Sequence, residues 1–220
     1  MAKDYSEDLL IQKSTAELLE QELGWKSVYA FDNEVLGEQG TLGRKSQHEV
    51  VLTRHLRMAL KRLNPWMTDK QLTEAIERMT SYMSSQTLMQ INEEKYQYLR
   101  DGVPVTRLKP NGETEQVRAR VIDFVNVDNN EFIAVRELWI KGPIHKRRAD
   151  VVCFVNGLPL IFIELKNHDQ DIQNAYTDNY RDYLDTIPHL FHHNAMIMLS
   201  NGMESRVGTV GAKWEFFHEW

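Results

Sequence analysis

Three ionisable residues interrupt two apolar runs in the second half of the chain. Asp150 lies near the start of one run, and Glu164 and Lys166 lie at the end of the next. Charged side chains seldom occupy buried strands unless they are paired or bind a metal ion. Two carboxylates on one face would raise each other's pKa unless a cation lay between them, and oxygen ligands suit Mg²⁺ better than zinc. These residue types predict a carboxylate-bound Mg²⁺ with a lysine beside it.

Such a site suits the hydrolysis of a phosphodiester bond. The amine of Lys166 could orient or deprotonate a water molecule for in-line attack. A metal ion held by Asp150 and Glu164 would neutralise charge on the phosphate and on the leaving oxygen. The chemistry expected from these three residues is therefore metal-assisted cleavage of a nucleic acid backbone.

Whether the two carboxylates share a face depends on the hairpin that joins the two runs. Asn156-Gly157 is a strong hairpin signal. A loop of these two residues alone would point Asp150 and Glu164 to opposite faces of the sheet. A three-residue loop over 156–158 would place the carboxylates opposite each other, with Lys166 following on the same face. We expect that loop, or a bulge that gives the same parity.

The elements that must position these residues can be predicted from periodicity and cap signals. Helices are expected over 7–23, 47–63, from the Thr68–Gln71 capping box to 83, and over 168–185. Strands are expected near 28–31 and over 116–125, 131–140, 149–155, 159–165 and 195–199. The pattern predicts an α/β fold with a mixed central sheet flanked by helices, and an inserted helical pair within residues 47–90. We interpret residues 1–220 as a single domain, cut from the N-terminal part of a longer chain.

Composition narrows the class of protein further. The chain has 220 residues, a formal net charge of −6 and one cysteine. Cys153 lies in an apolar run and is expected to be a buried filler in a reducing compartment. An acidic protein is unlike one that coats nucleic acid, so any DNA contact must be local or assisted by partners. No apolar run approaches the roughly 20 residues that span a bilayer, so we expect a cytoplasmic protein without a membrane partner.

Asp150 followed by Glu164-Leu165-Lys166 resembles the PD-(D/E)xK nuclease signature, with Ala149 where the proline would stand. The wider pattern resembles the N-terminal domain of type I restriction endonuclease R subunits over essentially all 220 residues. That pattern comprises Ser6-Glu7-Asp8, Leu63-Asn64-Pro65, Arg148-x-Asp150 and Asn156-Gly157-Leu158-Pro159-Leu160 before Glu164-Leu165-Lys166-Asn167.

The resemblance implies a restriction-endonuclease-like fold and Mg²⁺-dependent cleavage of unmodified double-stranded DNA. It implies methyltransferase and specificity subunits as partners, and an ATP-driven motor downstream. The chain itself contains no P-loop motif, so ATP use is not expected here.

Carried over residue by residue, the resemblance makes Asp150 and Glu164 metal ligands and Lys166 the catalytic lysine. It adds the backbone carbonyl of Leu165 as a further ligand, and Glu7 as a candidate acidic residue on the first helix. The family also has a Q-x-x-x-Y element after the lysine, which corresponds here to Asn179-x-x-x-Tyr183, with the amide one methylene shorter.

Ordinary interpretations stand beside these roles. Asp150 and Glu164 could be a structural pair neutralised by Arg148 and Lys166. Glu7 could serve only the dipole of its helix. The basic run 146–148, which includes Arg148, could contact DNA phosphates or form a solvated strand end.

Other conspicuous side chains receive no chemical role from the sequence. His189, His192 and His193 lack a partner set for zinc and are expected at the surface. Trp139, Tyr176 and Tyr180 are expected to pack against other residues rather than to read bases.

Two alternative functions remain open at this point. One is a noncatalytic module of the same fold that docks onto the methyltransferase core or couples a motor to DNA. The other is a nuclease that acts alone, against which the acidic charge balance counts because such an enzyme needs a basic groove.

Overall fold

A mixed seven-stranded sheet forms the body of the protein in a computed structural model that describes residue 15 and residues 17–220. Its strands are β1 (Lys26–Tyr29), β4 (Phe132–Lys141), β5 (Lys146–Val155), β6 (Leu158–Leu165), β7 (Met196–Ser200), β8 (Ser205–Gly208) and β9 (His218–Glu219). They lie side by side in the order β1-β4-β5-β6-β7-β8-β9. The pairs β1–β4 and β6–β7 are parallel and the other neighbours are antiparallel. The expected α/β fold with a mixed central sheet is confirmed.

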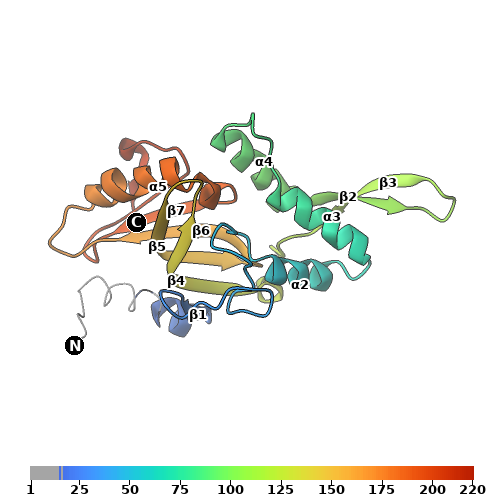
Figure 1. Cartoon of the computed structure of the whole chain (residues 1–220), viewed down its shortest axis with the longest axis horizontal. Coiled ribbons are helices and arrows are strands. Elements are labelled where there is room, and N and C mark those ends of the chain that lie inside the picture. The colour runs from blue at the N-terminus through green and yellow to red at the C-terminus, as the bar shows by residue number, and fades with distance from the viewer. Residues whose placement is uncertain (1–14, 16) are drawn as a thin grey trace.

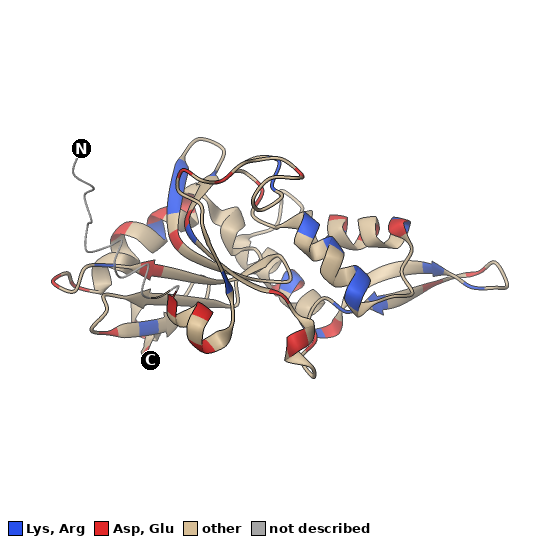
Figure 2. Ribbon diagram, turned by 90° about the horizontal axis from the view of Figure 1, so that it is seen from below, with Lys and Arg blue, Asp and Glu red and all other residues tan. Residues whose placement is uncertain are grey.

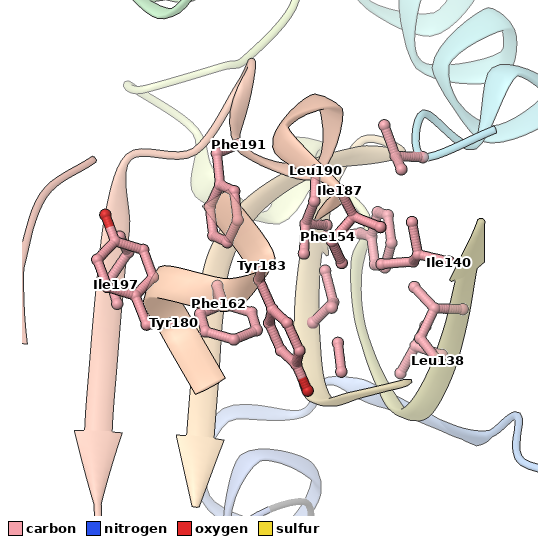
Figure 3. Packing of buried hydrophobic residues seen from close by; sticks show 14 of the residues in the cluster. Leu138, Ile140, Phe154, Phe162, Tyr180, Tyr183, Ile187, Leu190, Phe191 and Ile197 are labelled. Atoms are coloured by element: carbon pink, nitrogen blue, oxygen red, sulfur yellow. The ribbon is translucent and has the colours of Figure 1, made fainter. Parts of the chain in front are cut away.

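Helical segments cover one face of this sheet. They are η2 (Ala175–Tyr180), a π-helix, followed directly by α5 (Arg181–Thr186) and the 3₁₀ turn η3 (Pro188–Phe191). Their apolar side chains pack on buried residues of β4, β5, β6 and β7, and Figure 3 shows Tyr180, Tyr183 and Phe191 around Phe162. Smaller turns occur at η1 (Val127–Asn129) and η4 (Trp214–Phe216). The core therefore lies between the sheet and a short run of helix.

A second unit extends from the body as an arm, to the right in Figure 1. It consists of α2 (Thr53–Leu63), α3 (Asp69–Thr80) and α4 (Leu88–Asp101), followed by a two-stranded hairpin of β2 (Val103–Leu108) and β3 (Thr114–Ala119). The expected helical pair corresponds to α2 and α3. The predicted capping box is present at the start of α3, because Thr68 and Gln71 each accept the other's backbone N–H.

Helix α4 and strand β2 were not predicted, and the strand expected over 116–125 ends early. Pairing stops at Ala119 because the partner strand β2 begins opposite it, at Val103. Further along, Asp123 Oδ1 accepts the backbone N–H groups of Val125 and Asn126 at 3.1 Å each. An aspartate that bonds to the backbone two and three residues ahead forms a turn and competes with strand pairing. The β-branched residues 121 and 122 are therefore buried in the arm without belonging to a strand.

The turn between β5 and β6 has two residues, so the expected three-residue loop is wrong. Val155 pairs with Leu158, and Asn156 and Gly157 both have positive φ, 51° and 81°. That geometry is the type I′ turn that an Asn-Gly pair favours.

A β-bulge then restores the parity that the site needs. Phe154 pairs with Pro159 but Cys153 pairs with Ile161, so Leu160 is an extra residue on β6. Beyond the bulge Val151 pairs with Ile163, and continuing that register brings Asp150 opposite Glu164. The bulge alternative of the sequence analysis is confirmed.

Asn156 joins the hairpin to the arm. Its side chain is fully buried, and its Nδ2 donates to the carbonyl of Val121 and to Asn130, each at 2.8 Å. Its Oδ1 accepts from the N–H of Glu131 at 2.9 Å and from Arg62 at 3.1 Å. Four hydrogen bonds from one side chain therefore hold the turn, the start of β4 and the arm together.

The three histidines expected at the surface are buried, so that prediction was wrong. His189, His192 and His193 are 8%, 7% and 3% exposed. The segment that carries them lies under α4, where Asn92 donates to the carbonyls of Phe191 and Asn194. Long-range covering of a polar segment by another helix has no signal in the local sequence.

Three further predictions have different outcomes. Cys153 is buried, as expected. The helix expected over 168–185 begins only at Ala175. The helix expected over 7–23 is helical over 17–23, and its earlier part lies mostly outside the described residues. Among those that are described, no helix is long and apolar enough to cross a membrane.

Replacing Asn156 with Ala should lower the free energy of unfolding by about 2–4 kcal/mol, because a fully buried side chain loses its four hydrogen bonds. Chemical denaturation of the chain measures this loss. Asn111→Ala in the exposed turn of the β2–β3 hairpin is the matched control and should change stability by less than about 1 kcal/mol. Equal effects of the two substitutions would contradict the proposed role of Asn156.

Candidate functional site

A cavity of about 710 Å³ opens on the helix-covered face of the sheet, at the ends of β4, β5 and β6. Every described residue that the sequence singled out for the site lines it: Arg148, Asp150, Glu164, Leu165, Lys166, Asn179 and Tyr183. The cavity is also lined by Tyr29, Phe31, Glu137, Trp139, Lys146, Arg147 and Gln170. Glu7 lies outside the described residues. The fold thus gathers residues from 29 to 183 into one hollow.

Asp150 and Glu164 lie on neighbouring strands with their side chains on one face. Glu164 is 1% exposed. Asp150 Oδ2 accepts the backbone N–H of Leu165 at 2.8 Å, which ties the carboxylate to the end of β6. The bulge in β6 places both carboxylates toward the same cavity.

Burial makes both carboxylates reluctant to ionise. Burial raises the pKa of Asp150 to about 7, with a further rise from the charge of Glu137 and an opposing contribution from the Leu165 N–H. Burial also holds the pKa of Glu164 well above its usual range, and the neighbouring charge of Asp150 raises it further. Two ionised carboxylates at this depth require a compensating positive charge.

The donor set fits a hard divalent cation. Glu164 Oε2 is buried and has no hydrogen-bond partner among the described residues. Within the same part of the chain, no group of three His, Cys, Asp or Glu side chains is arranged to hold a metal ion by itself. Mg²⁺ is commonly bound through one or two carboxylates while it keeps several waters, whereas structural zinc needs four protein ligands. The residues present suit Mg²⁺ and do not suit zinc.

The backbone of Leu165 faces the same carboxylate. In a strand, the N–H and C=O of one residue point to the same edge. Because the Leu165 N–H is donated to Asp150, its carbonyl lies on the edge next to that carboxylate. The role of this carbonyl as a metal ligand stays a prediction.

Lys166 is oriented by the helix that covers the site. Its Nζ donates to Asn179 Oδ1 at 2.6 Å. Tyr183 donates from its hydroxyl to the carbonyl of Arg148 at 2.7 Å. In Figure 3 the ring of Tyr183 packs beside Phe162 with its hydroxyl directed away from that ring. Asn179 therefore reaches the lysine although its side chain is shorter than glutamine.

The π-helix explains how both residues reach the site. In η2 the N–H of Arg181 bonds to the carbonyl of Tyr176, five residues earlier. Such widened turns are rare and occur frequently at functional sites. Here the widened turn carries Asn179, and Tyr183 follows one turn later in α5.

Glu137 is a site residue that sequence reasoning missed. It is 2% exposed, and the pairing of Arg136 with Val151 and of Leu138 with Ala149 places it opposite Asp150. Its φ of 57° is left-handed, a conformation that costs an ordinary residue about 1–2 kcal/mol. The available signal was the rule that singled out Asp150, an acidic residue within a predicted apolar strand.

The basic residues of the site also bond to partners other than Asp150 and Glu164. Arg148 Nε bonds to Glu137 Oε2 at 2.6 Å, and Lys166 bonds to Asn179. Arg147, the next residue along β5, forms an ion pair with Asp182 on α5. The positive charge of Lys166 still lowers the pKa of both Asp150 and Glu164, and that of Arg148 lowers the pKa of Asp150, against the larger effect of burial.

Comparison with known proteins gives a consistent family. A family model described as "Type I restriction enzyme R protein N terminus" matches residues 4–216. The type I restriction enzyme HindI endonuclease subunit of Haemophilus influenzae is 33% identical over 204 residues, which cover 91% of this chain and 19% of that protein. The putative MjaIXP endonuclease subunit of Methanocaldococcus jannaschii is 26% identical, covering 100% of this chain and 21% of that protein. The chain therefore spans about a fifth of the length of the curated relatives it matches.

The raised pKa of Asp150 predicts a pH-dependent stability in the absence of divalent metal. The pKa of Asp150 in the folded chain, about 7, exceeds the value near 3.8 in the unfolded chain. Protonation of this carboxyl therefore contributes to stability, and the contribution is fully present below about pH 4. That contribution is lost as the pH rises through 7. Chemical denaturation with EDTA should therefore show lower stability at pH 8 than at pH 5, and Asp150→Asn should reduce the difference.

The exposed Asp185→Asn is the matched control and should leave the pH dependence unchanged. Addition of Mn²⁺ at pH 8 should restore stability to the wild-type chain, because a bound cation compensates the ionised carboxylates. An identical pH dependence in wild type and Asp150→Asn would contradict the pKa assignment.

Proposed function

This chain belongs to the family of type I restriction enzyme R protein N-terminal regions, and from that premise we propose that it is a Mg²⁺-dependent endonuclease domain. Its substrate is double-stranded DNA that lacks the protective modification. The observation that carries the proposal is the pair of carboxylates, half-buried Asp150 and buried Glu164, on one face of the sheet beside Lys166. The names of the relatives, which are endonuclease subunits, support the same activity.

Asp150 and Glu164 hold the metal ion in this proposal, with the carbonyl of Leu165 as a further ligand. Bound Mg²⁺ supplies charge neutralisation on the phosphate and the leaving oxygen. Glu164 Oε2, which has no hydrogen-bond partner among the described residues, is available to the ion.

Lys166 positions the attacking water and takes part in moving its proton. Its amine is held at 2.6 Å by Asn179, so the chain fixes its orientation before substrate arrives. Two contacts hold Arg148 in place. The hydroxyl of Tyr183 donates to its backbone carbonyl, and the carboxylate of Glu137 binds its guanidinium. Arg148 then presents a fixed positive charge for a DNA phosphate at the cavity.

Local contacts of this kind suit the charge of the whole chain. The net charge is −6, and Figure 2 shows acidic and basic residues interspersed rather than gathered on one basic face. Affinity for DNA depends chiefly on Lys and Arg at phosphates. We therefore propose that methyltransferase and specificity subunits, and an ATP-driven motor, bring DNA to this site in the cytoplasm.

The first test measures Mn²⁺ binding by calorimetry. Wild type should bind the ion, and the double variant Asp150→Asn, Glu164→Gln should lose binding because both anionic ligands become neutral. The exposed Glu77→Gln on α3 is the matched control and should bind as wild type does. A folded wild-type chain that binds no Mn²⁺ would overturn the metal site and favour the noncatalytic docking or DNA-coupling module.

The second test measures nicking of supercoiled plasmid with Mg²⁺ or Mn²⁺ at low ionic strength, where weak phosphate contacts persist. Lys166→Ala should lower the rate at least about a hundredfold, as expected for loss of a group that moves a proton. Lys70→Ala on α3, an exposed lysine remote from the cavity, should leave the rate unchanged. If Lys166→Ala cleaved the plasmid at the wild-type rate, the proposed role of the lysine would be excluded.

A further inference from the structure

One wall of the cavity is built from aromatic rings and cations that neither hold the proposed metal ion nor position the attacking water. This aromatic–cation surface consists of Tyr29, Phe31, Trp139, Lys146 and Arg148, all of which line the cavity. The residues come from β1 and the segment after it, from β4 and from the start of β5. They therefore lie beside the carboxylates without contributing to the metal ligands.

The three rings form a continuous row. The ring centroids of Tyr29 and Phe31 are 6.3 Å apart with an interplanar angle of 28°, and Phe31 and Trp139 repeat the same geometry. The tilt is small enough that the rings present similarly oriented faces. A row of nearly parallel rings is the arrangement on which planar groups stack.

Cations lie over the rings of this row. Lys146 Nζ lies 4.1 Å from the centroid of Trp139. The Arg148 guanidinium lies 5.0 Å from the centroid of Phe31 and 5.7 Å from that of Trp139. These distances are within the range of cation–π attraction. The wall therefore combines planar apolar faces with two positive charges.

Trp139 and Arg148 are held in place before any ligand arrives. Trp139 Nε1 donates to the carbonyl of Phe31 at 3.1 Å, which locks the indole against the segment after β1. Arg148 is held by the buried carboxylate of Glu137 at 2.6 Å. A ligand that bound here would not need to order these side chains, so little of its binding free energy would be lost.

Core packing does not account for these rings. Tyr180 and Phe162 in the core are fully buried, whereas Phe31 is 38% exposed and faces the cavity. A comparable cation–π pair occurs on α4, where Arg100 lies over the 53% exposed Tyr96. That pair lies on α4, outside the cavity that holds Asp150 and Glu164, so it is a matched control for ordinary surface packing.

We propose that the aromatic–cation surface binds unpaired nucleotides of DNA, stacking a base on its rings while its lysine and arginine hold the adjacent phosphate. In a duplex, base faces are covered by their neighbours and cannot stack on protein rings. In a single strand they can, and such stacking is tolerant of sequence. Lys146 is exposed and can leave the face of Trp139 to a base while it contacts the phosphate.

This inference rests on the proposed function and specifies the substrate at the same site. The nuclease would engage a strand that is locally unpaired next to the bond it cuts, rather than an undisturbed duplex. Such an unpaired strand is the form that has the base faces free for this wall.

Photocrosslinking tests the contact in the unaltered 220-residue chain. A single-stranded oligonucleotide of about 16 nucleotides carrying 5-iodouracil is irradiated with the protein in EDTA, so that no cleavage occurs. Crosslinks mapped by mass spectrometry should fall on Phe31, Trp139 or Tyr29. Crosslinks confined to other residues would overturn the proposal.

Fluorescence anisotropy tests the energetics with the same oligonucleotide and with its blunt duplex. Phe31→Leu and Trp139→Leu keep an apolar side chain but remove the ring, and each should weaken single-strand binding about tenfold. Tyr96→Leu should bind as wild type does. Unchanged single-strand affinity in both ring variants would overturn the proposal, and so would an equal loss of duplex affinity.

The outcomes separate this inference from the nuclease proposal, because binding in EDTA needs no metal. If the wild-type chain cleaves plasmid and the ring variants bind single strands as wild type does, the proposed role of the aromatic–cation surface is overturned and the nuclease proposal stands. If the chain binds no Mn²⁺ but its binding to single strands depends on the rings, the proposed role of the surface stands and the nuclease proposal is overturned.

Discussion

A half-buried carboxylate, Asp150, and a buried one, Glu164, on one face of a sheet are the constraint around which this structure is arranged. Each is disfavoured as an anion by burial, and Glu164 is further disfavoured by the charge of Asp150. When both carboxylates are ionised, the folded chain is therefore stabilised by a positive charge placed between them. The surrounding elements keep both carboxylates on one face of the sheet. On opposite faces they would not repel each other.

Backbone irregularities in two of the strands and in the covering helix bring the residues of the site together. A bulge in β6 sets the parity of Glu164, a left-handed residue in β4 places Glu137 opposite Asp150, and a π-helix carries Asn179 over Lys166. Regular strands and a regular helix would have been more stable locally. Irregular backbone at functional sites is a cost that the rest of the fold must offset.

The offset comes from the dense packing on either side of the site. One core lies between the sheet and η2, α5 and η3, and a second lies between the arm and the tip of the β5–β6 hairpin. Gly157 lies so close to the start of α2 that an added Cβ would approach the carbonyl of Leu52 to 2.5 Å. The arm thus supports the turn from which both carboxylate strands run, and it contributes to the site without lining it.

The sequence by itself determined which residues form the candidate site, because charges within apolar strands are costly and their positions are read directly from the chain. It identified Asp150, Glu164 and Lys166, the Asn-Gly turn and the parity that the site needs. Only the tertiary structure decided how that parity is reached, that Glu137 belongs to the site, and that aromatic residues from β1 and β4 form its wall. Bulges, left-handed residues and contacts between distant segments depend on packing across the whole fold, which leaves no local pattern to read.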